Sequence, residues 1–493
     1  MANTDFVSPL PPRRVMPEVE EEKTETVVAT TEDTVISEPV LKKPFPKILL
    51  LIPIIILLIV VVIAVVGSFK AKNIKNGQVV LNYWGLWEDA SIMDGVIADF
   101  EAKNPGIKVN YVKNQKVNYR SRLQGRLAKD ATTEEVPDVF RIHSSWLPML
   151  KTDLAKVPAG VTKSIGLETD FYKVFERDLK IGGNYVAVPL MYDGLALFYN
   201  KDLLEAIAAK PPRTWWDLKT TAEKLTVRDD TGVIKVAGAA LGMADNVDHW
   251  SDIVGLLMKQ MGADVWKNDV DSNKKIQEVL TFYTNFKTSY GVWDESFPDS
   301  TTLFASGKLG FYFAPSWRVF NLEEMNPNLR YEIVTVPQLP TLENAPIDSQ
   351  VPEESLTNIH WATYWSEGVN IKSKKQAEAW KFLEFLASRE SLQKMYTAAS
   401  QIRAFGEIYP RKSMANLIET ETKVKPFLAG ADLAQSSPLA SRTFDEGLND
   451  ELSAYFKDAI NSILQNNSTP DKAVETLRNG ITQIGTKYKI GGN

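Results

Sequence analysis

Segments with the strand-like spacing of apolar residues alternate with segments of helix-like spacing along most of this chain. Residues 79–84 form an apolar run that predicts a buried strand. Residues 91–103 place Met93, Val96, Ile97 and Phe100 at helical intervals. Residues 107–112 alternate apolar with polar side chains, and residues 138–142 form another short strand-like run. Because strands alternate with helices, the pattern predicts an α/β fold. Its sheet should be largely parallel and bind ligands at the carboxyl ends of its strands.

One uncharged run near the N-terminus breaks this alternation. Residues 48–69 are 22 apolar or small residues, which as a helix would reach roughly 33 Å, enough to cross a bilayer core of about 30 Å. Residues 1–47 hold seven prolines and nine acidic residues and are predicted to be disordered. We therefore expect a disordered tail at 1–47, an uncleaved transmembrane helix at 48–69 and a linker at 70–78. Lysines flank the run on both sides, so the positive-inside rule leaves its orientation open.

Composition excludes several classes of function. The chain has no cysteine, which removes disulfides, thiol nucleophiles and a lipidated N-terminal cysteine. Its three histidines lack metal-ligand spacing, and no glycine-rich phosphate loop is present. A net charge of −6 gives no basic footprint for nucleic acid. We expect neither a metal nor a cofactor, and no nucleic-acid partner.

Tryptophans recur beside short polar side chains where strands are predicted to begin or end. Residues 84–89 (Trp-Gly-Leu-Trp-Glu-Asp) follow the first strand, and residues 143–146 (His-Ser-Ser-Trp) follow a later one. Trp317 follows an apolar run and Trp365 precedes another. A single tryptophan is more often part of a core than of a site. Its repetition at the ends of strands favours a binding role.

Several longer motifs resemble one family, the extracellular solute-binding proteins of sugar-importing ABC transporters (family 1, the maltose-binding-protein group). The most specific are residues 189–204, residues 212–218 (Pro-Arg-Thr-Trp-Trp-Asp-Leu) and residues 304–310 (Phe-Ala-Ser-Gly-Lys-Leu-Gly). Further similar segments are 100–109, 137–139, 368–371 and 377–386. The resemblance covers nearly all of residues 79–420 and is weaker beyond them.

The resemblance implies a two-lobed, periplasmic-binding-protein-like fold of type II over residues 79–493. Its first lobe would span about 79–191 and 360–412, and its second about 192–359 and 413–493. The implied function is to capture a carbohydrate ligand, specifically an oligosaccharide, and to deliver it to ABC permease subunits without catalysis. Relatives are often tethered by a lipidated cysteine, which is absent here, so the predicted helix would be the tether. The binding domain would then lie outside the cell membrane and the tail in the cytoplasm.

A sugar needs aromatic rings against its C–H faces and polar groups for its hydroxyls. The resemblance aligns Asp193 with an acidic ligand contact and Trp317 with a stacking tryptophan of the family. The full set of candidate ligand-binding residues is Trp84, Trp87, Glu88, Ser144, Ser145, Trp146, Asp193, Asn246, Trp250, Trp317 and Trp365.

Other residues are expected to be structural. Thr214 and Asp217 predict a helix capping box, and Trp215 with Trp216 should pack in its first turn. Asp138, just inside a strand, should also be structural, whereas Trp293 and Trp361 fit a core or a cleft equally well.

Two other functions, a glycosidase and a tethered receptor, compete with transport. Glu88 and Asp193 could form a glycosidase pair, but the resemblance favours binding without turnover, and no Gly-x-Ser-x-Gly elbow surrounds Ser144. A tethered receptor that senses a sugar or another small solute remains open. A polyamine or peptide ligand is disfavoured, because tryptophans outnumber carboxylates in the predicted loops.

Overall fold

The computed structural model describes residues 77–129, 136–341, 345–347 and 349–490. The predicted tail, the predicted membrane helix and residues 70–76 of the predicted linker lie outside these residues. Within the described part, none of the helices has the length and apolar character needed to cross a bilayer. Residues Lys75–Asn493 form one compact unit, which is described here by itself.

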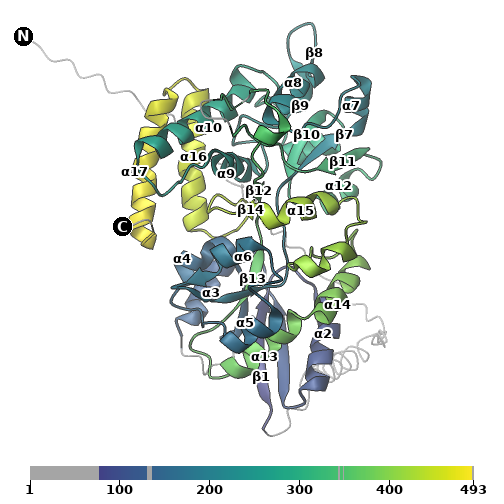
Figure 1. The fold of residues 1–493 in the computed structure, drawn as a ribbon, viewed down its shortest axis with the longest axis vertical. Helices are drawn as coiled ribbons and strands as arrows, with labels where there is room; N and C mark the ends of the chain where they lie inside the picture. The colour runs from purple at the N-terminus through teal and green to yellow at the C-terminus, as the bar shows by residue number, and fades with distance from the viewer. Residues whose placement is uncertain (1–76, 130–135, 342–344, 348, 491–493) are drawn as a thin grey trace, which may run out of the picture. The chain divides into compact units, whose positions relative to one another are not determined.

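The first of two five-stranded sheets has the strand order β2-β1-β3-β13-β6. Strand β1 runs parallel to β2 and β3, whereas β13 runs antiparallel to β3 and β6. The strands are β1 (Val79–Gly85), β2 (Ile107–Lys113), β3 (Val139–His143), β6 (Ala187–Pro189) and β13 (Trp365–Val369). We call the part of the chain built around this sheet the first lobe (lower half of Figure 1).

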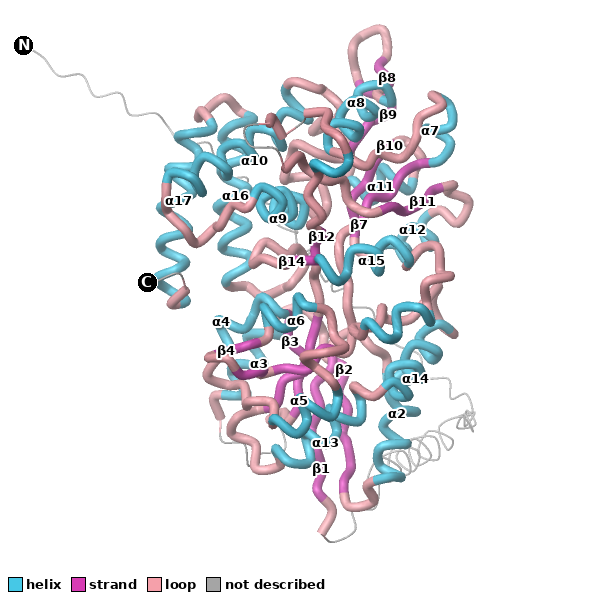
Figure 2. Tube along the Cα trace, viewed as in Figure 1, coloured by secondary structure: helices cyan, strands magenta, loops and turns pink. Residues whose placement is uncertain are grey.

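The second sheet has the order β11-β7-β10-β9-β8. Only its β9–β10 pair is parallel, and the other pairs are antiparallel. Its strands are β7 (Ala196–Asn200), β8 (Val227–Arg228), β9 (Ile234–Ala239), β10 (Leu309–Ala314) and β11 (Tyr331–Val334). The part built around it is the second lobe (Figure 2). The predicted largely parallel sheet is therefore wrong, because β7 and β13 enter their sheets from the opposite lobe and run against their neighbours.

Helices pack around both sheets (Figures 1 and 2). Those of the first lobe are α2 (Ala90–Lys103), α3 (Tyr119–Leu127), α4 (Leu147–Leu150), α5 (Ala159–Ile165), α6 (Lys173–Asp178), α13 (Gln376–Leu386) and α14 (Arg389–Ser400). Those of the second lobe are α7 (Lys201–Ala206), α8 (Trp215–Leu225), α9 (Trp250–Met261), α10 (Val270–Thr288), α11 (Ser300–Ala305) and α12 (Arg318–Met325). Later in the chain, α15 (Lys425–Gly430) precedes α16 (Leu448–Leu464) and α17 (Pro470–Tyr488), both of which contact α10.

Short elements complete the fold. The two-residue strands β4 (Lys180–Ile181) and β5 (Asn184–Tyr185) pair antiparallel, and β12 (His360–Trp361) pairs parallel with β14 (Ala434–Gln435). Short 3-10 helices are η2 (Ser144–Trp146), η3 (Glu353–Ser355), η4 (Lys412–Leu417) and η5 (Ala431–Leu433).

Local sequence signals account for several of these elements. Helix α2 buries Met93, Val96, Ile97 and Phe100, the residues that the helical spacing selects. At the start of α8 the predicted capping box between Thr214 and Asp217 is confirmed, since each side chain accepts a hydrogen bond from the other residue's backbone N–H.

The two adjacent tryptophans at the start of α8 differ in their burial. Trp215 is fully buried and stacks on Phe313 of β10, with ring centroids 5.4 Å apart and planes 14° apart. Trp216 is only half-buried. The packing role predicted for Trp215 is therefore confirmed.

Two of the segments that cross between the lobes lie side by side. Residues 190–195 lead from β6 to β7, and residues 362–364 lead from β12 to β13. They pair with each other, because Gly194 forms an antiparallel bridge with Ala362 and Thr363 N donates to the carbonyl oxygen of Asp193 at 3.0 Å. A Cβ on Gly194 would lie 2.3 Å from the carbonyl oxygen of Trp361, so this crossing requires glycine.

Candidate functional site

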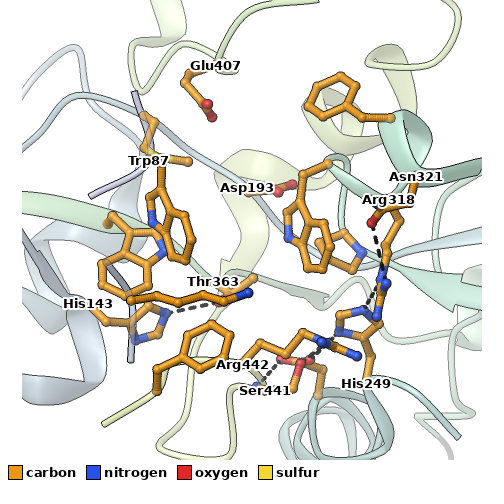
Figure 3. A pocket seen from close by; sticks show the side chains of 18 of the residues that line it. Trp87, His143, Asp193, His249, Arg318, Asn321, Thr363, Glu407, Ser441 and Arg442 are labelled. Atoms are coloured by element: carbon orange, nitrogen blue, oxygen red, sulfur yellow. Dashed lines mark hydrogen bonds and ion pairs between the residues drawn. The ribbon is translucent and has the colours of Figure 1, made fainter. Parts of the chain in front are cut away.

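A cavity of about 440 Å³ is lined by residues of both lobes and of the crossing segments. In Figure 3, Trp87 and His143 of the first lobe lie on one side. Arg318, Asn321 and His249 of the second lobe lie on the other side. A ligand in this cavity would therefore touch both lobes.

Three of the predicted stacking tryptophans line the cavity: Trp87, Trp317 and Trp365. Trp87 and Trp365 meet edge to face, with centroids 5.3 Å apart. Trp317 lies at the start of α12, where the guanidinium of Arg318 is 4.6 Å from its ring centroid and the His249 ring meets its edge at 5.6 Å. These contacts restrict each indole, so the cavity presents aromatic surfaces that are already ordered before a ligand arrives.

Asp193, in the first crossing segment, lines the same cavity and is 4% exposed. Its Oδ1 accepts hydrogen bonds from the backbone N–H groups of Gly194 (2.8 Å) and Ser316 (3.1 Å). Burial raises the pKa of Asp193 to about 7, although these two backbone donors favour the ionised form. Near neutral pH this carboxyl group is thus able to accept a hydrogen bond from a ligand hydroxyl or to donate one.

Asp193 should make stability depend on pH. Its pKa rises from 3.8 in the unfolded chain to about 7 in the folded one, so its contribution favours folding at low pH and is lost as the pH rises through 7. Asp193→Asn keeps an oxygen for both backbone donors and carries no charge. We therefore expect the free energy of unfolding of this variant, relative to that of the wild type, to be greater at pH 8 than at pH 5. Urea denaturation of both proteins at the two pH values measures this. A stability difference that does not change with pH would contradict it.

A buried polar network forms the second-lobe side of the cavity. Arg318 Nε donates to His249 Nε2 at 3.0 Å, and Arg318 Nη2 forms an ion pair with Asp248 at 3.0 Å. Burial lowers the pKa of His249, which keeps its ring neutral and leaves Nε2 free to accept from Arg318. His249 Nδ1 lies 2.7 Å from Ser441 Oγ. The network therefore holds in place the side chain of Arg318, whose guanidinium group packs against Trp317.

Four predicted residues lie in a layer behind the cavity. Glu88 is buried in an ion pair with Arg141; burial opposes its ionisation, but the charge of Arg141 prevails and lowers its pKa. Trp146 is fully buried and meets Trp365 edge to face at 5.2 Å. Ser145 Oγ lies 2.7 Å from Nδ1 of His143, which does line the cavity. The fourth residue, Ser144, is also buried and does not line the cavity.

The other three candidates do not line the cavity. Trp84 is half-buried beside Tyr119, at a separate open hollow on the first lobe. Asn246 holds a second-lobe loop, since its Oδ1 accepts from Trp293 Nε1 at 2.8 Å and its Nδ2 donates to two backbone carbonyls. Trp250 is half-buried at the start of α9.

Residues for which the sequence left the role open, or favoured structure, fall in the core. Trp293 and Trp361 are each 1% exposed, and Trp361 Nε1 donates to Asp252 at 2.8 Å. Asp138 accepts from Asn82 N at 2.9 Å and pairs with Lys375 at 3.0 Å, so its predicted structural role is confirmed.

Sequence reasoning missed most of the charged residues of the cavity. They come from helices, strands and loops far apart in the chain, and several lie where the family resemblance weakens. The lining residues that were not predicted are Lys116, His143, Met191, His249, Asp252, Pro315, Arg318, Phe320, Asn321, Thr363, Arg403, Glu407, Ser441, Arg442 and Phe444. Across the residues that the structure describes, no group of three or more histidine, cysteine or acidic side chains is arranged to hold a metal ion.

Comparison with known proteins identifies what this architecture is similar to. The family of bacterial extracellular solute-binding proteins matches residues 84–393. A putative binding protein of Brucella abortus is 25% identical over 305 residues, which cover 59% of this chain and 67% of the relative. A multiple sugar-binding protein of Streptococcus mutans is 20% identical over 346 residues, which cover 68% of this chain and 77% of the relative.

Solved structures share the fold. The crystal structure of a cyclo/maltodextrin-binding protein complexed with maltotetraose superposes with a TM-score of 0.64 at 18% identity, covering 84% of this chain and 99% of that one. At this identity the likeness shows the fold alone, the mixed α/β, two-lobed type II fold of solute-binding proteins.

Proposed function

The chain belongs to the family of bacterial extracellular solute-binding proteins. We propose that it captures a carbohydrate ligand, specifically an oligosaccharide, between its lobes and delivers it to the permease of an ABC importer. Membership of this family of transport proteins makes the chain a binding protein and not an enzyme. The family also implies that the binding domain lies outside the cytoplasm.

The observation that carries the proposal is the set of groups in the cavity. Trp87, Trp317 and Trp365 supply aromatic faces, and Asp193 supplies a buried carboxyl group beside them. Aromatic faces with convergent polar groups suit the C–H faces and hydroxyls of a sugar. The names of the relatives support the same ligand class, since one is a multiple sugar-binding protein and the solved neighbour holds maltotetraose.

Capture would proceed by closure of the two lobes. The ligand contacts both walls of the cavity only when the lobes are together, so its differential affinity for that form shifts the population toward it. The paired crossing segments at Gly194 and Ala362 are where the change in backbone angles would be absorbed. The permease would then recognise the closed form.

The experiment that tests this proposal is a thermal-shift panel on the full chain. A detergent without a sugar headgroup is needed, because a maltoside would compete for the cavity. We expect the melting temperature to rise with at least one oligosaccharide, since a ligand that binds only the folded state stabilises it. A panel in which amino acids or polyamines raise the melting temperature and no carbohydrate does would refute the sugar assignment.

Residues 48–69 are proposed as an uncleaved membrane anchor that tethers this binding domain outside the cell. The support is the length of the uncharged run together with the absence of any cysteine for lipidation. Two measurements test it: the protein should stay in membranes washed with alkaline carbonate, and protease added to intact cells should digest the binding domain. Release by carbonate would contradict the anchor.

A further inference from the structure

One segment of the cavity wall contacts both lobes. Residues 441–446, which we call the strap, follow β14 and precede α16. On the first lobe, Arg120 donates to two carbonyl oxygens of the strap, and the ring of Phe444 lies 6.3 Å from that of Trp87. On the second lobe, Ser441 N donates to Asp252 Oδ1 at 3.1 Å. The strap therefore spans the two walls between which the ligand would lie.

The strap has an unusual backbone. Arg442, Phe444 and Glu446 have φ values of 55°, 54° and 46°, in the left-handed region that side chains other than glycine rarely adopt. Such conformations persist where surrounding contacts hold them, and they cluster at ligand-binding sites. Here Arg442 and Phe444 both line the cavity.

Arg442 is incompletely neutralised. Its guanidinium contacts Asp248 Oδ1, and Arg318 forms an ion pair with the same oxygen. The other oxygen, Asp248 Oδ2, accepts from Thr301. One carboxylate thus serves two guanidinium groups. The side chain of Arg442 remains 42% exposed, so part of its planar set of donors is available to a ligand.

Lys116 brings a second cation from the first lobe. It lines the same cavity, and its ammonium lies 4.8 Å from the ring centroid of Phe444 in the strap. No ion pair joins Lys116 to a carboxylate among residues 77–490 as far as the structure describes them. Lys116 of the first lobe and Arg442, which pairs with Asp248 of the second lobe, therefore both line the cavity beside the strap.

The carboxyl groups that line the cavity already have partners or are only partly ionised. Glu407 pairs with Arg403 at 2.6 Å, and Figure 3 shows it well apart from Arg442. Asp252 Oδ1 accepts from both Trp361 and Ser441. Asp193 is only partly ionised near neutral pH, because burial raises its pKa to about 7. The positive charges of Arg442 and Lys116 therefore remain available to a ligand at the end of the cavity beside the strap.

We propose that the ligand is an acidic saccharide, whose carboxylate, sulfate or phosphate group is bound by Arg442 and Lys116 while its rings lie against the tryptophans. This inference rests on the proposed carbohydrate-binding function. A guanidinium group matches the geometry of an oxyanion in two parallel hydrogen bonds, and an ammonium adds a point charge. Because the two cations come from different lobes, an acidic group between them would also favour closure.

The test compares matched acidic and neutral saccharides by calorimetric titration of the full chain. Suitable pairs are oligogalacturonates with galacto-oligosaccharides, sulfated with unsulfated disaccharides, and sugar phosphates with their free sugars. We expect the acidic member of at least one pair to bind at least tenfold more tightly at low salt, with an advantage that shrinks as salt rises. The pair that responds distinguishes carboxylate, sulfate and phosphate.

Variants locate the effect. Arg442→Gln and, on the first lobe, Lys116→Gln should each weaken binding of the acidic saccharide at least several-fold more than binding of its neutral partner. Arg330→Gln is the matched control, because Arg330 pairs with Asp202 and Glu205 away from the cavity. Neutral saccharides that bind as tightly as their acidic partners, or a preference that survives both variants, would overturn this inference and leave the carbohydrate function standing. A panel with no binder at all would overturn both.

Discussion

Replacing Trp317 by alanine is expected to weaken carbohydrate binding about 100-fold, which corresponds to about 2.8 kcal/mol. Trp317 lines the cavity with Arg318 held against its ring and His249 at its edge. Truncation removes a large apolar face that is ordered in advance, and loss of such a face costs both its contact area and its stacking. The dissociation constant from calorimetric titration measures the change.

Trp84→Ala is the matched control. Trp84 was equally a candidate from the sequence, but it lies beside Tyr119 at a separate hollow and does not line the cavity. Its removal should leave the dissociation constant within about twofold. Equal losses in the two variants would indicate a general effect on folding, and an unchanged affinity in Trp317→Ala would show that the ligand binds elsewhere.

Replacing Arg141 by methionine is expected to lower the free energy of unfolding by about 3–5 kcal/mol, as breaking a buried ion pair does. Arg141 is 2% exposed and pairs with both Glu88 and Glu367. Burial raises the pKa of Glu367, and the charge of Arg141 opposes that rise. Without the guanidinium, two buried carboxyl groups would lose their shared cation. Urea denaturation at neutral pH measures the loss.

An exposed ion pair provides the comparison. Arg213 pairs with Glu353, and the two side chains are 69% and 64% exposed. Arg213→Met should change the free energy of unfolding by no more than about 1 kcal/mol, because water and salt screen such a pair. If Arg141→Met lowered the free energy of unfolding as little as Arg213→Met does, the ion pairs of Arg141 with Glu88 and Glu367 would not stabilise the fold.

Local signals in the sequence were sufficient for the elements but not for their pairing. The helical spacing of Met93, Val96 and Phe100 and the Thr214–Asp217 capping box depend on residues a few positions apart, and both appear as predicted. The direction of β13 does not follow from its own residues. It depends on the crossing segment that delivers it from the second lobe, so a mixed sheet replaces the largely parallel one.

The cavity shows the same limit. Trp87, Trp317, Trp365 and Asp193 were selected from motifs, and all four line it; their contact with a ligand remains a prediction. Glu88 was selected in the same way, but a partner 53 positions away draws it into the layer behind. Arg442 carried no local signal, because its position depends on a strap whose contacts lie on both lobes.

Carbohydrate binding in the cavity is tested most directly by calorimetric titration of the full chain, in detergent without a sugar headgroup, with a saccharide that raises its melting temperature. We predict saturable binding of one saccharide per chain, strongly weakened in Trp317→Ala and retained in Trp84→Ala. Binding that is untouched by Trp317→Ala, or tight binding of an amino acid or polyamine with none of any saccharide, would contradict it.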